Sequence, residues 1–443
     1  MIARLLTRWV TRLLTREKLQ FAILAAMRMG ISFSQLVIVV VAGTLLDQAD
    51  FGRFAIIYAG ARLLAAFAGL GAPSFLLKDV PWRQAKGMPW HSAGAATLTF
   101  IVYPALICAA VGAGAEAIGR TGTAYYPLLP GEGAAMALLG FVWAGMLALG
   151  AYVRTTRGAT EAMLVADLYT PLAMLAALTA LWAAGLPQVI RIVLLCCAIV
   201  GATQLAMLAW HAVRGWIPVG GPNAEPVRIR ELVAYWGTVL LNTASTQIDI
   251  LIAGSVVGPV ATGVYTVIKR FTNVLAIPLS IAVWIIAPQI SRASATGDRA
   301  VLERCARTAN RLSFLPCLVL AAGVGASAPW WFAWFGFAMT GEALAVLGIL
   351  LLANVLSVAF GPAMAFATQS GMPGLAVRSL ALAIAVAGAW MALGGAWHGI
   401  AAIALGQVIM YLFINIPVRQ VILRQYGFDF TILAMLRRAP RHP

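Results

Sequence analysis

The chain is built almost entirely from long apolar stretches that are separated by short polar connections. Of its 443 residues, 62% are hydrophobic and only 10% are charged, which gives a mean hydropathy of +0.89. A helix needs about 20 apolar residues to cross the hydrocarbon core of a bilayer. The stretches are continuously apolar rather than alternating, which excludes a membrane barrel of strands. The sequence therefore predicts an all-α polytopic membrane protein.

About twelve of these stretches are long enough to be predicted as transmembrane helices. They cover residues 19–46, 53–77, 92–118, 133–153, 162–185, 189–213, 232–256, 261–289, 312–337, 343–369, 375–397 and 399–423. The connections between them are short, so the sequence leaves no room for a catalytic domain outside the membrane.

A segment rich in proline and glycine, 214–231, divides the predicted helices into two groups of six. We expect an N-terminal bundle over residues 19–213, a C-terminal bundle over 232–423, and a cytoplasmic linker between them. A short internal repeat favours two duplicated halves, because 51–57 and 262–268 share a glycine, an aromatic residue and an isoleucine at equal spacing. Each copy opens the second helix of its half, an arrangement that many transporters have.

The placement of basic residues predicts the orientation in the membrane. One side holds most lysines and arginines, whereas the other side holds only Arg53, Arg120 and Arg191. By the positive-inside rule, both termini are cytoplasmic. Residues 1–18 place apolar and basic side chains on opposite faces, which predicts an interfacial amphipathic helix, and 424–443 form a cytoplasmic tail. Topology and attraction to anionic membrane lipids explain the net charge of +16, so no nucleic-acid partner is expected.

Six charged residues nevertheless lie inside the apolar segments. They are Arg28, Arg62, Asp167, Asp249, Lys269 and Arg270. A charge at the centre of a membrane helix costs roughly 2.5–3.5 kcal/mol on the insertion scale, so such residues usually face a bundle interior or a wet cavity. Four of the six are cationic, and Asp249 is the only well-placed counter-ion. We therefore predict a hydrated cavity of net positive charge between the halves, which suits an anionic cargo.

Polar residues recur at helical spacing beside these charges. The stripes place Gln35 with Arg28, Asn242 with Asp249, Asn273 with Arg270, and Gln407 with Tyr411 and Asn415. The candidate substrate-binding residues are Arg28, Arg62, Lys269, Arg270, Gln35, Asn242 and Asn273. For the neutral members, hydrogen bonding between helices is the alternative.

Asp249 is the candidate for a group that couples transport to a proton or a sodium ion, because a buried carboxylate near cations can change its occupancy with conformation. A static salt bridge from Asp249 to Arg270 or Lys269 is the alternative, and the sequence leaves both open. The four histidines and the carboxylates show no metal or catalytic spacing, and no glycine-rich phosphate loop occurs. We expect no metal, no cofactor and no enzymatic centre, and we interpret the five cysteines as free thiols.

Several segments resemble motifs of one family. They are 46–54 (LDQADFGRF), 69–73 (GLGAP), 247–254 (QIDILIAG), 263–265 (GVY) with 269–270 (KR), 287–292 (APQISR) and 334–336 (WFG). In this order they resemble the polysaccharide-transport (O-antigen and exopolysaccharide flippase) family of the multidrug/oligosaccharidyl-lipid/polysaccharide (MOP) exporter superfamily.

That resemblance implies two six-helix bundles in a V-shaped, MATE-like architecture that opens alternately to either side of the bacterial inner membrane. It implies a cargo of oligosaccharide on a polyprenyl pyrophosphate such as undecaprenyl pyrophosphate, moved from the inner to the outer leaflet for surface polysaccharide synthesis. It also implies that Arg28, Arg62 and Arg270 bind the pyrophosphate, and that glycosyltransferases and a polysaccharide polymerase are partners.

Two other classes of protein remain as alternatives. One is a multidrug exporter of the same superfamily, although such pumps handle mostly cationic drugs and favour acidic cavities. The other is a membrane polymerase or ligase that acts on lipid-linked sugars, which would need a sizeable outer loop for its catalytic groups.

Overall fold

The computed structural model describes residues 16–85, 96–121, 128–157, 161–162, 164–186, 188–213 and 229–432. Throughout these residues the regular structure is helical, so the predicted all-α class is confirmed. Most of the predicted interfacial helix (1–18), of the linker (214–231) and of the tail (424–443) lies outside the described residues. The described parts of these three segments belong to helices or adjoin one, since α2 begins at Arg16, α11 at Ile229, and the last long helix ends at Tyr426.

The first half contains seven α-helices and two π-helical turns in its described residues. They are α2 (Arg16–Leu45), α3 (Gln48–Ala68), α4 (Ala72–Ala85), η1 (Leu98–Val102), α6 (Tyr103–Arg120), α7 (Glu132–Thr156), η2 (Leu164–Leu168), α9 (Tyr169–Ala183) and α10 (Val189–Val213).

The second half continues with α-helices and one 3₁₀ turn. They are α11 (Ile229–Val256), α12 (Pro259–Asn273), η3 (Val274–Ala276), α13 (Ile277–Thr296), α14 (Arg299–Ala326), α15 (Ala328–Trp334), α16 (Gly341–Ala359), α17 (Ala363–Gln369) and α18 (Pro373–Tyr426).

Nine helices in the described residues are long and apolar enough to cross a membrane. The number is smaller than the twelve predicted segments for identifiable reasons. α18 combines the last two segments across a kink at His398 and Gly399. Within the described residues, the apolar stretches of the first and fifth predicted segments are Phe33–Leu45 and Tyr169–Ala183, and neither reaches the length of a full span. The predicted helices over 53–77 and 343–369 are each wrong as single helices, because Gly71 (φ 76°) and Gly361 (φ 71°) adopt left-handed conformations that end the first helix of each pair.

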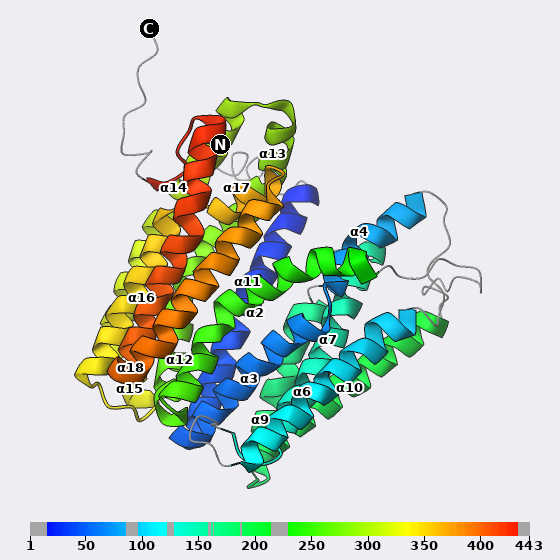
Figure 1. The fold of residues 1–443 in the computed structure, drawn as a ribbon, viewed down its shortest axis with the longest axis vertical. Coiled ribbons are helices and arrows are strands. Elements are labelled where there is room, and N and C mark those ends of the chain that lie inside the picture. The colour runs from blue at the N-terminus through cyan, green and yellow to red at the C-terminus, as the bar shows by residue number, and fades with distance from the viewer. Residues whose placement is uncertain are drawn as a thin grey trace, which may run out of the picture.

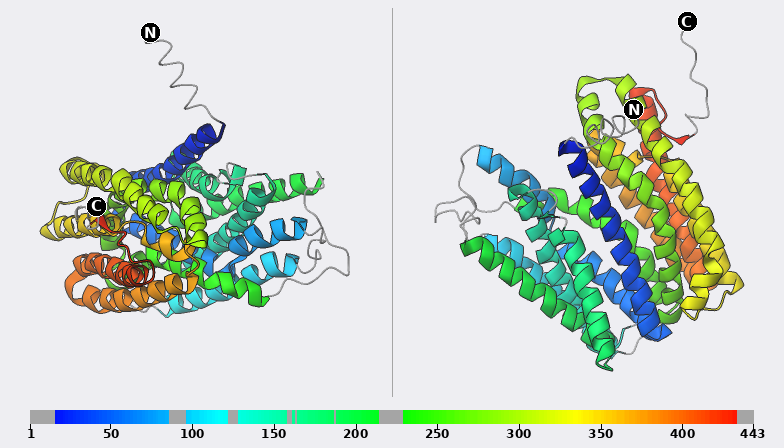
Figure 2. Two further views of the ribbon diagram at one scale, coloured as in Figure 1. Left: turned by 90° about the horizontal axis from the view of Figure 1, so that it is seen from above. Right: turned by 180° about the vertical axis from the view of Figure 1, so that it is seen from behind.

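The helices form two groups that diverge toward one end of the molecule (Figure 1). α3, α4, α6, α7, α9 and α10 make up one group, and α12 to α18 make up most of the other. α2 lies between them and contacts both α9 and α12. The start of α2 and the end of α18 lie at the same end, where the groups are apart (Figure 2). This arrangement is compatible with both termini on one side of a membrane, and the cytoplasmic assignment of that side stays a prediction.

The two halves are in close contact where the copies of the internal repeat lie. α3 packs against α11 and α12, and a Cβ added to Gly52 would lie 1.8 Å from the carbonyl oxygen of Pro259. A Cβ added to Gly263 would lie 3.0 Å from the ring of Phe51. Each repeat glycine therefore permits close approach of a helix from the opposite half.

Candidate functional site

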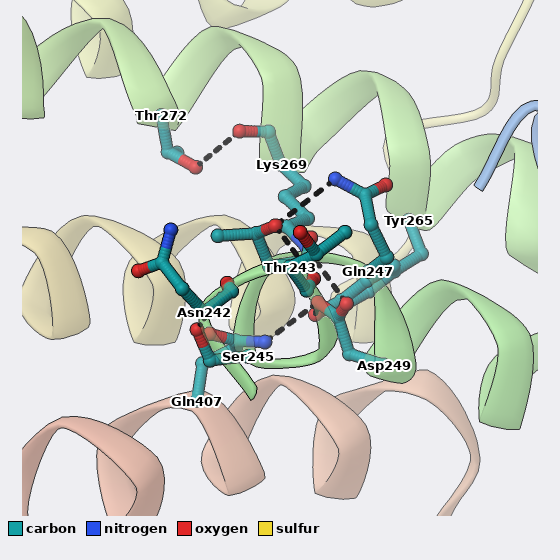
Figure 3. A network of polar contacts seen from close by, with 10 residues as sticks. Asn242, Thr243, Ser245, Gln247, Asp249, Tyr265, Lys269, Thr272 and Gln407 are labelled. Carbon is teal, nitrogen blue, oxygen red and sulfur yellow. Dashed lines mark hydrogen bonds and ion pairs between the residues drawn. The ribbon is translucent and has the colours of Figure 1, made fainter. Parts of the chain in front are cut away.

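Asp249 on α11 is the centre of a buried polar network. Its carboxylate is fully buried and accepts hydrogen bonds from Tyr265 Oη (2.6 Å), Lys269 Nζ (2.7 Å) and Gln407 Nε2 (2.7 Å). Lys269 Nζ also donates to the carbonyl oxygen of Thr246 at 2.7 Å. The network joins α11, α12 and α18, and all of these side chains point toward one another (Figure 3).

The Asp249–Lys269 contact is a salt bridge in which both partners are removed from water. Lys269 is 5% exposed and Asp249 is 0% exposed. Burying two charges costs several kcal/mol for each ion, and the mutual attraction compensates only when further hydrogen bonds satisfy the remaining atoms. Tyr265 and Gln407 supply those bonds here. Of the two salt bridges considered from the sequence, the structure therefore contains the one to Lys269 and not the one to Arg270.

Arg270, the next residue on α12, points into a different environment. It lines a small pocket between α2, α3 and α12. The other lining residues are Gln35, Ile38, Val39, Phe51, Phe54, Ala55, Tyr58 and Thr266. The interior has room for roughly one water molecule.

This pocket contains polar atoms without protein partners. Among the described residues, Arg270 Nε, Tyr58 Oη and Thr266 Oγ1 are buried and make no hydrogen bond. Tyr58 is 6% exposed and Thr266 is 2% exposed, so water reaches neither hydroxyl freely. Because most buried polar groups in proteins are hydrogen-bonded, three unsatisfied groups around one pocket indicate a place for a polar ligand.

Aromatic rings, rather than carboxylates, hold the two arginines of this region. The guanidinium carbon of Arg270 lies 5.9 Å from the centroid of the Tyr58 ring, and that of Arg62 lies 5.3 Å from the centroid of Trp143. Tyr58 and Trp143 are themselves in edge-to-face contact, with centroids 5.1 Å apart. Within the described part of the chain, neither arginine forms an ion pair with a carboxylate. A ring face attracts a cation without neutralising it, so both charges are available to an anion.

The remaining predicted site residues lie at varied positions. Gln35 lines the Arg270 pocket, whereas Asn242 is exposed on α11 and Asn273 is half-buried at the end of α12. Neither asparagine lines that pocket. The side chains of Arg28 on α2 and Asp167 in η2 lie outside those that the structure describes.

Sequence reasoning did not identify every residue of these two sites. It placed Tyr58 on one face with Arg62 and Thr266 in one stripe with Arg270, but it proposed neither as a binding residue, and it did not connect Tyr265 with Asp249. Gln407 was marked only as part of a polar stripe, and that stripe was the available signal. The five cysteines are all buried and free, as predicted. No group of three potential metal ligands occurs in the described residues.

No protein-family model and no curated protein matches the chain. Solved structures of similar fold exist. The chain is similar to the inward-facing conformation of a multidrug resistance MATE family transporter of the MOP superfamily, with a TM-score of 0.70, 16% identity, and coverage of 94% of this chain and 100% of that chain. The outward-facing conformation of such a transporter gives a TM-score of 0.62 at 16% identity, over 92% and 95% of the two chains.

A third similar structure is a MOP superfamily transporter from Pyrococcus furiosus, for which reverse polarity of the binding pocket is described as suggesting a different function. Its TM-score is 0.64 at 16% identity, over 92% of this chain and 95% of that chain. Identities of this size define the fold, and the fold is that of MATE transporters of the MOP superfamily. The predicted MATE-like architecture is therefore confirmed, and the chain folds as a multi-pass membrane protein.

Proposed function

We propose that this protein is a membrane transporter that moves an oligosaccharide linked to polyprenyl pyrophosphate from the inner to the outer leaflet. The observation that carries the proposal is the pair of arginines, Arg62 and Arg270, whose charges no described carboxylate neutralises. The pyrophosphate is the part of such a cargo that cannot cross hydrocarbon unaided. Arginine suits it because the guanidinium donates several charge-assisted hydrogen bonds and stays protonated.

The residues around Arg270 add donors for phosphate oxygens. Tyr58 and Thr266 present buried hydroxyls without partners, and Gln35 adds an amide. A phosphate oxygen that enters this pocket gains hydrogen bonds that the protein does not satisfy internally. The prenyl chain would stay in lipid while the headgroup crosses between the halves. Alternation between the two observed classes of MATE conformation, inward-facing and outward-facing, would expose the site first to one leaflet and then to the other.

Glycosyltransferases would build such a cargo on the inner leaflet, and a polysaccharide polymerase would consume it on the outer one. Both classes of enzyme are therefore proposed as functional partners in the bacterial inner membrane.

Multidrug export is the second candidate function, and the solved structures of similar fold favour it. They include a structure of the MATE multidrug transporter DinF-BH, with a TM-score of 0.63 at 12% identity. The charge of the site opposes this candidate for cationic drugs, because Arg62 and Arg270 would repel them.

The proposal is tested in a strain that lacks the gene and is complemented by variants. Arg62→Gln and Arg270→Gln should each reduce surface polysaccharide and cause lipid-linked intermediates to accumulate, at normal protein levels. Arg120→Gln is the matched control, since the Arg120 side chain is 77% exposed at the end of α6. Normal polysaccharide from both site variants contradicts the proposal, and loss of drug resistance instead favours multidrug export.

Two nearly isosteric variants separate function from stability. Tyr58→Phe and Thr266→Val remove hydroxyls that make no hydrogen bond, so neither should lower the thermal stability of the protein. If the hydroxyls bind the cargo, both variants should nevertheless transport more slowly. Unchanged transport in both would show that the pocket does not contact the cargo.

A further inference from the structure

The ammonium group of Lys269 lies among oxygen atoms in the C-terminal half. Asp249 Oδ1 and the carbonyl oxygen of Thr246 each lie 2.7 Å from Nζ. The other carboxylate oxygen, Oδ2, is occupied by Tyr265 and Gln407, which both donate to it. Asp249 Oδ1 is thus left to a cation, and the lysine supplies one (Figure 3).

These oxygens are the kind of ligand that a small monovalent cation would use. A carboxylate and a backbone carbonyl are hard oxygen donors, and the carboxylate is fully buried, where its charge requires a counter-ion. Tyr265 and Gln407 hold the carboxylate from α12 and α18, so its orientation does not depend on the lysine alone. The surroundings of Nζ therefore form a preorganised cation site whose occupant is covalently attached to α12.

We propose that Lys269 is a tethered cation that occupies a monovalent cation site permanently, so that the wild-type protein binds no free sodium ion at Asp249. Asp249 then orients α11, α12 and α18 in every conformation instead of gaining and losing an ion. The proposal concerns the Asp249 network alone. It does not depend on which cargo the Arg270 pocket binds, so each of the two proposals can fail without the other.

The local geometry of α12 explains why a tether would be useful. Lys269 and Arg270 are consecutive, so their side chains leave the helix about 100° apart. One reaches the Asp249 network, and the other lines the pocket between the halves. A free cation at Asp249 could exchange with water whenever the halves separate, whereas the lysine stays with its helix and keeps Arg270 in a fixed orientation.

The test removes the tether and asks whether a free ion replaces it. Thermal unfolding of the purified full-length chain is measured in sodium, lithium, potassium or choline chloride at one ionic strength. The Tm of the wild type should be the same in all four salts. Lys269→Met, which keeps the length of the stem but not the charge, should be less stable in choline than in at least one of the small cations, by about 2 °C or more. The double variant Asp249→Asn with Lys269→Met should lose that difference, because it lacks the carboxylate.

Two results of the salt comparison would overturn the proposal. A Lys269→Met protein with equal Tm in all four salts would show an ordinary ion pair, and sodium-dependent stability of the wild type that Asp249→Asn abolishes would show that a free ion already binds. If Lys269→Met does not fold, Lys269→Ala is expressed and purified in ethylammonium chloride, since a free amine can fill the vacated position. Ethylammonium that yields no more folded Lys269→Ala protein than choline does also overturns the proposal.

Discussion

We predict that a larger residue at the contact between α3 and α12 changes how the two halves move. Gly52 lies where a Cβ would meet the carbonyl oxygen of Pro259 at 1.8 Å and its carbonyl carbon at 2.4 Å. Gly52→Ala therefore requires backbone, and not a flexible side chain, to move. Since an unstrained carbon–oxygen contact is about 3.3 Å or longer, the two helices must separate by roughly 1.5 Å.

The size of the effect follows from opposing contributions. Overpacking of this kind costs about 1–3 kcal/mol, whereas alanine in place of glycine inside a helix contributes about 0.8–1 kcal/mol in the opposite direction. The overpacking raises the free energy only of conformations in which the halves touch at this point. The higher helix propensity of alanine stabilises every conformation equally. If Gly52→Ala destabilises the conformation in which α3 and α12 touch by about 2 kcal/mol relative to the one in which they are apart, the ratio of the two populations changes about 30-fold in favour of the separated conformation.

Accessibility of a single introduced cysteine measures this change. Ala55 lies three residues after Gly52 on α3, is 5% exposed and lines the Arg270 pocket. Because the native cysteines are all buried, a water-soluble maleimide should react mainly with Ala55→Cys, and faster when Gly52→Ala is also present. Gly114→Ala on α6 is the control, since nothing lies within 4 Å of its Cβ position. The labelling rate of Ala55→Cys is compared in the otherwise native protein, with Gly52→Ala and with Gly114→Ala. Equal rates in all three proteins, with unchanged Tm, would refute the argument that the close approach holds the halves together.

Three further predictions concern stability. Asp249→Asn should lower the free energy of unfolding by about 3–5 kcal/mol, because it leaves the Lys269 ammonium buried without its counter-ion; denaturant titration measures the loss. Although burial raises the pKa of Asp429, hydrogen bonds from Arg419 and from a backbone N–H outweigh it and hold the pKa below its ordinary value. The stabilisation is then present above the unfolded-state pKa and is lost as the pH falls through the lower folded-state pKa, so acid titration of unfolding should show a slope that Asp429→Asn removes. Asn310→Leu should cost about 1–3 kcal/mol and speed proteolysis after α18, because the Asn310 amide donates to a backbone carbonyl of that segment at 2.8 Å.

The helical class could be predicted from hydropathy, because the apolar runs are long and the connections short. The breaks inside those runs could not. Leu70 and Gly71 both have positive φ between α3 and α4, yet the residues around them are as apolar as the helices on either side. Hydropathy measures burial in lipid, and a left-handed turn buried by neighbouring helices does not change it.

The charged residues of the candidate site could be predicted from the sequence, but their partners could not. Arg62, Asp249, Lys269 and Arg270 are conspicuous in apolar segments, but helical periodicity indicates only the face of a helix and not the neighbour that it meets. The contact of Asp249 with Gln407 spans 158 positions of the sequence, and no local pattern specifies such a pair. The sequence paired Tyr58 with Arg62 of the same helix, whereas the structure places Tyr58 against Arg270 of α12 and Trp143 of α7 against Arg62. These pairs were missed for the same reason, since each ring lies on a different helix from its arginine.

The structure also changes how the charge of the site is counted. The sequence placed four cations against one carboxylate, whereas Asp249 neutralises Lys269 and leaves Arg62 and Arg270 on aromatic rings. The distinction matters because a carboxylate partner would have to be displaced before an anion could bind, but a ring face leaves the guanidinium donors directed outward. Two such cations, separated by the Tyr58–Trp143 pair, favour a cargo with more than one negative charge. A diphosphate meets that requirement better than a single phosphate does. Under the proposed function, we therefore expect each arginine variant to weaken transport. Neither variant should abolish folding, because neither arginine pairs with a described carboxylate.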